Sequence, residues 1–247
     1  MSTGNSQMNT VNKRANQWKI GLGAAFALFL FLMAAPAIAA GGSGFSLSVT
    51  PASAATQPGA AAVFAIAEKC NTCSVSLGAT ISPIVSNGPT MTLSRYHIIN
   101  SGGAALRVGA GPSTPLMTYT ITVIARDTQS GSTKSVNVTL TVNDFTVTAN
   151  PTSVTVASGQ TATSTVTVTG FNGFSGTIYY SVNEPSATTT GLACNLQPDP
   201  VTLSSTVTSI SSTLSCSGTP GTYNVVISGT PYNGVPVRSA TVTITVR

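Results

Sequence analysis

The chain has 247 residues, of which only 6% are charged, and Thr, Ser, Val, Gly and Ala dominate it. This composition is typical of short β-strands and turns, and low charge with regular Val/Thr alternation argues against disorder. The formal net charge of +5 falls to +2 once the first 40 residues are set aside, and the remaining charges are scattered. A nucleic-acid-binding protein would carry a basic stripe instead, so we expect no nucleic-acid partner.

Residues 1–40 have the pattern of an export signal. A polar leader with three cationic residues precedes an apolar run over 20–35, and Ala37-Ile38-Ala39 fits the small-x-small cleavage rule. The alternative is an uncleaved anchor, which would attach the chain to a membrane through this segment alone. The apolar run is shorter than the roughly 20 residues of a spanning helix. We therefore expect an extracellular or cell-surface protein.

The rest of the chain is an internal duplication. Phe45, Pro51 and Gly59 recur 100 positions later, and Tyr119 and Val142 recur 104 positions later. Such a repeat indicates two copies of one structural unit. We place the first unit at 45–143 and the second at 144–247.

Each unit has turn signals every eight to twelve residues and no helical period. Seven short strands are expected in the second unit, which predicts an all-β fold of two tandem β-sandwich domains. The middle of the first unit, 69–108, diverges from the second, so its strand order is left open. The expected strands of the second unit cover 146–149, 161–169, 177–182, 201–203, 211–215, 223–228 and 239–246.

The joint between the units is very short. Apolar residues alternate with polar ones up to Val142, and a new alternation starts at Phe145, so that only Asn143 and Asp144 lie between two strands. A joint of two residues restricts the angle between domains far more than a Gly/Ser linker does. The sequence predicts a semi-rigid pair.

The second unit resembles the immunoglobulin-like repeats of secreted bacterial and archaeal surface proteins. The resemblance rests on an opening F-x-V-x-x-x-P, a G-F-S-G at 173–176 and a closing T-P-G-T-Y-x-V at 219–225. The first unit matches at both ends. The resemblance implies an immunoglobulin-like sandwich that is extracellular and usually non-catalytic, and nothing finer.

Four cysteines divide evenly between the units, Cys70 with Cys73 and Cys194 with Cys216. In an oxidising compartment they are expected to form one disulfide in each unit, since the other two pairings would link different units. Redox activity of Cys70-Asn71-Thr72-Cys73 would favour a helix N-terminus, haem attachment needs a His after Cys73, and zinc needs two further ligands. We expect no cofactor and no metal.

Other chemistry-bearing residues are few. His97 is the only histidine, and the acids beyond residue 40 are too dispersed for a paired-carboxylate site. We therefore expect no enzyme. Tyr119 and Tyr223 occupy equivalent positions, where a tyrosine hydroxyl caps a backbone group in many sandwiches.

Three surface features point to partners. Phe171 and Tyr232 lie in predicted loops, where an aromatic ring can stack on a sugar. Asn137-Val138-Thr139 is a glycosylation sequon on an outward strand position. The strand with Phe45, Leu47 and Val49 follows a Gly-rich lead, which would let it swing out and pair with another copy.

Three functions follow from these features. The leading one is a non-catalytic structural or adhesive surface protein, a semi-rigid rod of two domains whose partners are copies of itself or other surface proteins. The second is a subunit of an extracellular filament built by strand exchange. The third is an accessory module that binds polysaccharide through its loop aromatics.

Overall fold

The computed structural model describes residues 37–38, 44–183, 191–232 and 234–247. Within these ranges every regular element is a β-strand, and no helix is long and apolar enough to cross a membrane. The predicted signal at 1–40 lies outside the described residues except for β1 (Ala37–Ile38), which pairs antiparallel with β2 (Ser46–Thr50).

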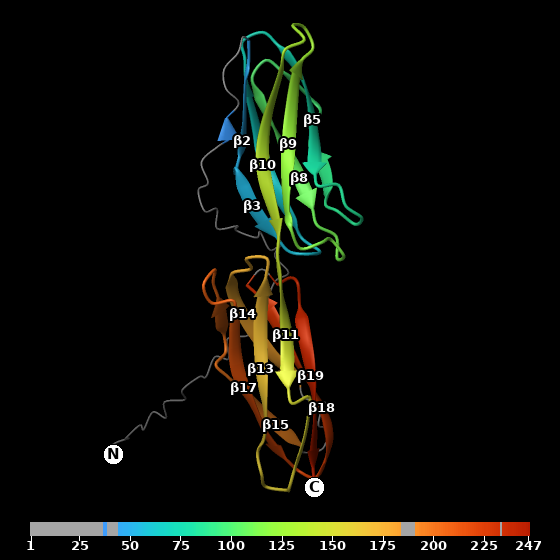
Figure 1. Ribbon diagram of the computed structural model, residues 1–247, viewed down its shortest axis with the longest axis vertical. Coiled ribbons are helices and arrows are strands. Elements are labelled where there is room, and N and C mark those ends of the chain that lie inside the picture. Colours follow the sequence, from blue (N-terminus) through green and yellow to red (C-terminus); the bar gives the residue numbers. More distant parts are fainter. Residues whose placement is uncertain (1–36, 39–43, 184–190, 233) are drawn as a thin grey trace, which may run out of the picture. The chain divides into compact units, whose positions relative to one another are not determined.

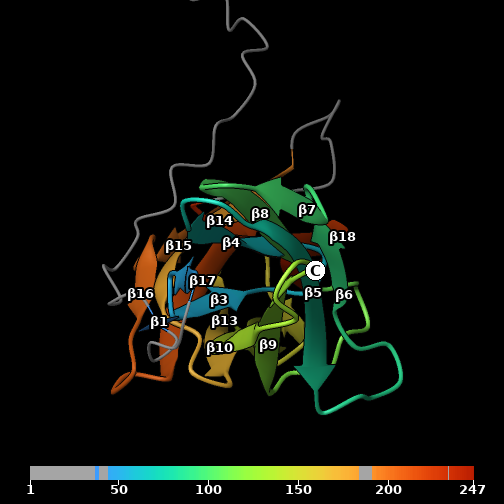
Figure 2. The same ribbon diagram turned by 90° about the horizontal axis from the view of Figure 1, so that it is seen from above.

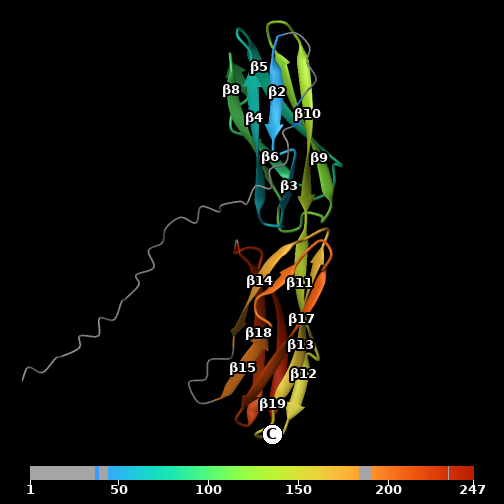
Figure 3. The same ribbon diagram turned by 90° about the vertical axis from the view of Figure 1, so that its left-hand side faces the viewer.

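The first sandwich comprises β2 to β10 and packs two sheets against each other (Figures 1 and 3). One sheet has the order β2, β4 (Ala61–Lys69), β8 (Gly102–Gly109) and β6 (Thr90–Leu93), with β1 at its edge. The other has the order β3 (Ser53–Thr56), β10 (Thr133–Val142), β9 (Thr118–Asp127), β5 (Ser74–Ser82) and β7 (His97–Ile99).

The second sandwich comprises β11 to β19 (Figures 1 and 2). One sheet has the order β11 (Asp144–Asn150), β13 (Ala162–Phe171), β17 (Ser209–Gly218) and β15 (Leu192–Gln197). The other has the order β12 (Ser153–Val156), β19 (Arg238–Val246), β18 (Gly221–Pro231), β14 (Gly176–Asn183) and β16 (Val201–Leu203).

The two sandwiches share one connectivity. Numbered from its own first strand, each has the sheet orders 1-3-7-5 and 2-9-8-4-6, and its second strand pairs in parallel with its ninth. The first sheet corresponds to strands A, B, E and D of an immunoglobulin domain and the second to the sheet of strands C, F and G. The chain thus folds into two tandem immunoglobulin-like β-sandwiches, and the divergent middle of the first keeps the strand order of the second.

The structure corrects the expectation of seven strands in the second sandwich, which has nine. The two missed strands are β12 and β15. Both are short, and both lie at the edge of a sheet, where a strand has one neighbour and needs fewer apolar residues.

Each sandwich has its own hydrophobic core, built by period-two alternation. On β4 the buried residues include Phe64 and Ile66, and on β18 they include Val225 and Ile227. Burial of each large apolar side chain stabilises the fold by about 1.5–3 kcal/mol. The outer faces carry hydroxyl pairs between neighbouring strands, such as Thr167 with Ser211 at 2.9 Å.

Equivalent turns support the duplication. Gly59 and Gly159 both have positive φ angles, 89° and 81°, in the turn before the third strand of each sandwich. Gly131 and Gly234, at 74° and 82°, serve the hairpins before the last strands. A side chain with a Cβ rarely adopts these angles, so glycine is required at the same points of both copies.

The predicted tyrosine corners are confirmed. The Tyr119 hydroxyl donates to the Pro115 carbonyl at 3.2 Å, and the Tyr223 hydroxyl donates to the Thr219 carbonyl at 3.0 Å. In each sandwich this bond ties the start of the penultimate strand to the preceding loop.

Replacement of either corner tyrosine by phenylalanine should destabilise its own sandwich by about 1 kcal/mol, because a carbonyl loses its hydrogen-bond donor. Urea unfolding of Y119F and Y223F measures this, with Y179F on the exposed face of β14 as the control. Unchanged midpoints in both corner variants would show that these hydrogen bonds add no stability.

Candidate functional site

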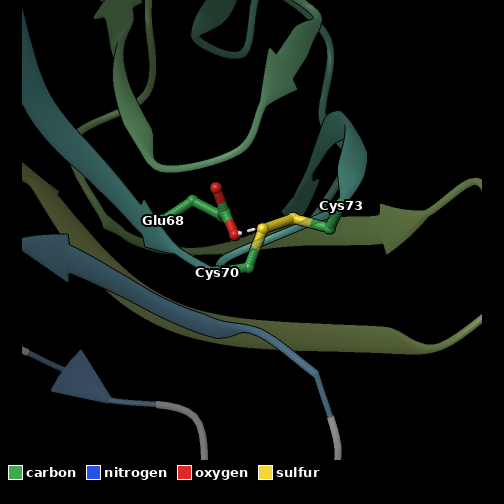
Figure 4. Close-up of side chains that lie close together, drawn as sticks. All are labelled: Glu68, Cys70 and Cys73. Carbon is green, nitrogen blue, oxygen red and sulfur yellow. Dashed lines mark hydrogen bonds between the residues drawn. A yellow bond between two sulfur atoms is a disulfide. The ribbon is translucent and has the colours of Figure 1, made fainter.

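The residues that stand out chemically are Glu68, Cys70 and Cys73 in the first sandwich (Figure 4). Glu68 is the last inward position of β4 and is 1% exposed, and the turn that contains both cysteines leads directly into β5. Cys70 and Cys73 form a disulfide, with their Cα atoms 6.1 Å apart. Glu68 Oε1 lies 3.3 Å from Cys73 Sγ.

The other oxygen of Glu68, Oε2, is buried and has no hydrogen-bond partner among the described residues. A buried carboxyl oxygen without a partner costs about 1–3 kcal/mol. A disulfide sulfur carries no proton, so a hydrogen bond between Glu68 and Cys73 requires that the carboxyl group carry it. The contact therefore suits a neutral Glu68.

The electrostatic surroundings favour the same state. Burial raises the pKa of Glu68 above its ordinary value of 4.5, and the nearby charge of Asp127 raises it further. Asp127, at the end of β9, accepts hydrogen bonds from the Ser130 hydroxyl and the Gln129 backbone N–H, and these lower the pKa of Asp127. The ionised Asp127 thus disfavours a second negative charge on Glu68.

The turn at 70–73 is held by hydrogen bonds as well as by its disulfide. The backbone N–H of Asn100 donates to the Cys73 carbonyl at 2.8 Å. The Cys70 backbone N–H donates to Ser101 Oγ at 3.1 Å, and the Ser101 hydroxyl donates to the Cys70 carbonyl at 2.7 Å. The backbone around both cysteines is therefore fixed by the strand β7 and the residues that follow it.

The two disulfides differ in how much they restrict the unfolded chain. Cys194 and Cys216 face each other on β15 and β17, 22 positions apart in sequence, and the loop-entropy model gives such a bridge about 3 kcal/mol. Cys70 and Cys73 are 3 positions apart, for which the same model gives about 2 kcal/mol. The buried Glu68 oxygen costs about 1–3 kcal/mol, which offsets what the Cys70–Cys73 disulfide contributes. A gain in stability alone therefore does not explain why Glu68, Cys70 and Cys73 lie together.

A hollow of about 480 Å³ lies at the turn 70–73. Its lining includes Lys69, the turn at 70–73, Ser101 and Asp127. Molecules from solution therefore have an approach to the disulfide. As a metal centre the cluster is weak while the disulfide is formed, because bonded sulfurs are not thiolates and the carboxyl group is then the one remaining strong ligand.

The predicted aromatic residues lie on the surface of the second sandwich. Phe171, the last residue of β13, is 43% exposed, and Tyr232, in the turn after β18, is 89% exposed. Phe171 pairs with Asp144 in the sheet, and Asp144 forms an ion pair with Arg238 at the start of β19. Both aromatic residues thus lie at the same end of that sandwich.

The remaining predicted residues lie in the first sandwich. Asn137 is exposed on β10, and its Oδ1 accepts a hydrogen bond from the Thr122 hydroxyl at 2.8 Å. Phe45, Leu47 and Val49 are buried in the core, where β2 pairs with β4. Strand exchange through this segment would have to withdraw all three side chains from that core.

The sequence reasoning did not single out Glu68 as a site residue. One signal was present, since strict alternation along Ala61–Lys69 gives Glu68 the same parity as Phe64 and Ile66. An acidic residue at an inward position, two residues before a Cys-x-x-Cys turn, indicates a buried carboxyl group beside a disulfide.

No protein-family model and no curated protein matches the chain. Solved structures that resemble it include domains 4 and 5 of the S-layer protein SbsC, with 20% identity and a TM-score of 0.33 over 56% of this chain and 69% of that one. The fibronectin(III)-like modules of Clostridium thermocellum CbhA share 12% identity, with a TM-score of 0.29 over 81% of this chain and 94% of that one. Titin domains z1z2 share 19% identity, with a TM-score of 0.26 over 79% and 92%. The fold assignment rests on the strand order, not on these scores.

The raised pKa of Glu68 gives a pH dependence of stability. The folded chain binds this proton more tightly than the unfolded chain does, so the contribution is fully present below pH 4.5 and is lost as the pH rises through the folded-state pKa. The E68Q variant, in which a neutral isostere replaces Glu68, should not lose stability in this pH range for this reason.

The free energy of unfolding of E68Q relative to the parent chain should therefore increase with pH above pH 4.5. Urea unfolding over a pH series measures it. A constant difference between the two chains at every pH would show that Glu68 has the same pKa in the folded and unfolded states.

Proposed function

We propose that the chain is a non-catalytic structural or adhesive protein of the cell surface, and that its two sandwiches form a semi-rigid rod. The observation that carries this proposal is the joint between them. Strand β10 ends at Val142 and β11 begins at Asp144, so a single residue, Asn143, belongs to neither strand.

Each residue of the joint is held by the sandwich next to it. Asn143 is buried, its backbone N–H donates to the Thr56 carbonyl at 3.0 Å, and its Oδ1 accepts from Gln57 Nε2 at 3.3 Å. Asp144 accepts from the Phe145 backbone N–H at 2.8 Å and pairs with Arg238. Few backbone torsions are therefore free to change the angle between the sandwiches.

The surface chemistry supports a location at the cell surface. The outer faces are covered by Thr and Ser, and hydroxyl pairs such as Thr118 with Thr141 and Thr222 with Thr245 lie across neighbouring strands. Uncharged pairs are not screened by salt, so such faces keep their interactions outside the cell, where ionic strength varies. The disulfides fit the same oxidising compartment.

Nuclear spin relaxation of the backbone amides tests the rod. The two sandwiches should share one rotational correlation time, because a joint of this length couples their tumbling. A matched variant with about six Gly and Ser residues inserted between Asn143 and Asp144 should show two shorter correlation times. If the parent chain already tumbles as two independent bodies, it is not a rod.

A second candidate function, binding of polysaccharide by the second sandwich, is favoured by the exposure of Phe171 and Tyr232. An aromatic ring that is already exposed can bind a sugar ring without any rearrangement of the fold. Its flat face is the surface on which sugars stack. This function is compatible with the rod, which would display the two rings.

Alanine at Phe171 or Tyr232 should reduce retention of the chain on insoluble polysaccharide and leave the free energy of unfolding within about 0.5 kcal/mol of the parent value. Y96A is the matched control, since Tyr96 is also exposed but lies in the first sandwich. Equal retention of all three variants and the parent would sink the polysaccharide hypothesis.

A further inference from the structure

The Cys70–Cys73 disulfide lies among groups that could satisfy both thiols after reduction. Cys70 Sγ is 3.4 Å from the Asn100 carbonyl oxygen, and Cys73 Sγ is 3.3 Å from Glu68 Oε1. A thiol is a hydrogen-bond donor and a disulfide sulfur is not. Cys70 Sγ therefore already faces an acceptor that only its reduced form can use, and Cys73 Sγ faces a carboxyl oxygen that can accept from its thiol once Glu68 is a carboxylate.

Reduction would also leave the turn in place. The hydrogen bonds of the turn to Asn100 and Ser101 involve backbone atoms and the Ser101 hydroxyl, and they do not depend on the sulfur–sulfur bond. The disulfide can thus open and close without rearrangement of β4, β5 or β7.

We propose that Cys70–Cys73 is a reversible thiol–disulfide centre whose reductant is an external dithiol, and that Glu68 exchanges a proton with Cys73 in each direction. The inference rests on the buried carboxyl group with one oxygen against Cys73 and the other without a partner among the described residues. It is further supported by the hollow that gives access to the turn.

In the reductive direction, a thiolate of the dithiol attacks Cys70 Sγ, so that Cys73 Sγ, which lies beside Glu68, is the leaving sulfur. A bond forms between the sulfur of the dithiol and Cys70 Sγ. The Cys70–Cys73 bond breaks, and its electron pair goes to Cys73 Sγ. That sulfur takes the proton of the Glu68 carboxyl group, which becomes a carboxylate. In the reduced chain this carboxylate accepts a hydrogen bond from the Cys73 thiol.

The second thiol of the reductant then loses its proton to solvent and displaces Cys70 from the mixed disulfide. The reductant leaves as a disulfide, and Cys70 Sγ takes a proton from solvent. Two electrons pass from the dithiol to the protein. In the oxidative direction the disulfide form of the same reagent is the oxidant. The Cys70 thiolate attacks it, one reagent sulfur leaves as a thiolate, and a mixed disulfide forms. The Glu68 carboxylate then takes the proton of Cys73, and the Cys73 thiolate attacks Cys70 Sγ, which restores the Cys70–Cys73 bond and releases the second thiolate of the reagent.

The charged groups around Glu68 set the pH range of this exchange. The flanking strands β2 and β8 place Leu47 and Gly102 opposite it, and neither is charged. Asp127 on β9 disfavours the carboxylate. Lys69, the next residue on β4, is exposed, and the Nζ of Lys134 on β10 lies 5.5 Å from the Phe45 ring centroid.

The test measures the rate of reduction of each disulfide in the folded full chain by dithiothreitol, with alkylation of the released thiols and mass spectrometry. Rates are divided by the thiolate concentration of the reductant, over a pH series that starts near the ordinary carboxyl pKa of about 4.5 and runs to about pH 9, so that the remaining pH dependence belongs to the protein. Cys194–Cys216, in the other sandwich, is the internal control.

We expect the normalised rate at Cys70–Cys73 to fall as the pH rises, because Glu68 loses the proton that it supplies. In E68Q the rate should be roughly tenfold lower at the acidic end and independent of pH, since a glutamine cannot donate a proton to a leaving thiolate. In the reduced chain, the thiol pKa of Cys73 should be lower in E68Q, because the neighbouring negative charge is gone. Cys194–Cys216 should react identically in both chains.

Equal normalised rates at Cys70–Cys73 in the parent chain and E68Q would overturn the role of Glu68. A Cys70–Cys73 bond that is reduced only when the first sandwich is unfolded by urea would overturn the reversible centre itself. Urea unfolding of E68Q is the folding control. E68Q should be at least as stable as the parent chain at neutral pH, so a slower exchange in E68Q would not be due to misfolding.

Discussion

The whole structure depends on strict alternation of apolar and polar side chains along its strands. A shift of one residue in any strand pairing would turn valines outward and threonines into a core, so the pattern fixes the register of both sandwiches. The chain meets this constraint with almost no charge, because hydroxyl groups take the outer positions and pair across neighbouring strands, as Thr167 does with Ser211. A buried acid in such a chain is therefore an exception that the fold itself does not require.

Alternation also decides which parts of the fold could be predicted. Strands with long apolar runs on one face, such as β13 and β19, were found at nearly their observed bounds, and so were the corner tyrosines Tyr119 and Tyr223. The sequence does not predict the edge strands β12 and β15, because a strand with one neighbour needs few apolar residues and so has a weak alternating pattern. The sequence does not predict the strand order in the middle of the first sandwich, because its residues diverge from those of the second while the strand order stays the same.

The cluster at Glu68 could be predicted only in part. The pairing of Cys70 with Cys73 is predicted because the other pairings would link different units, but the environment of the carboxyl group depends on residues far along the chain. Asp127 arrives from β9, and Asn100 and Ser101 follow β7, so the charge and the hydrogen bonds around the turn exist only after both sheets have packed. A local pattern shows that a residue points inward, and it does not show what that residue meets there.

The comparison between the two copies bears on what the first disulfide is for. In the second sandwich, Cys194–Cys216 joins the paired strands β15 and β17. The equivalent strands of the first, β6 and β8, keep the same pairing without cysteine, so this fold holds together there through its ladder and core alone. The first sandwich instead has its disulfide in a turn already fixed by hydrogen bonds, beside an acid that lowers its stability. The first sandwich thus folds without a disulfide at the position of Cys194–Cys216. The second sandwich folds without one at the position of Cys70–Cys73. The proposed thiol–disulfide exchange explains the Cys70–Cys73 disulfide better than a contribution to stability does.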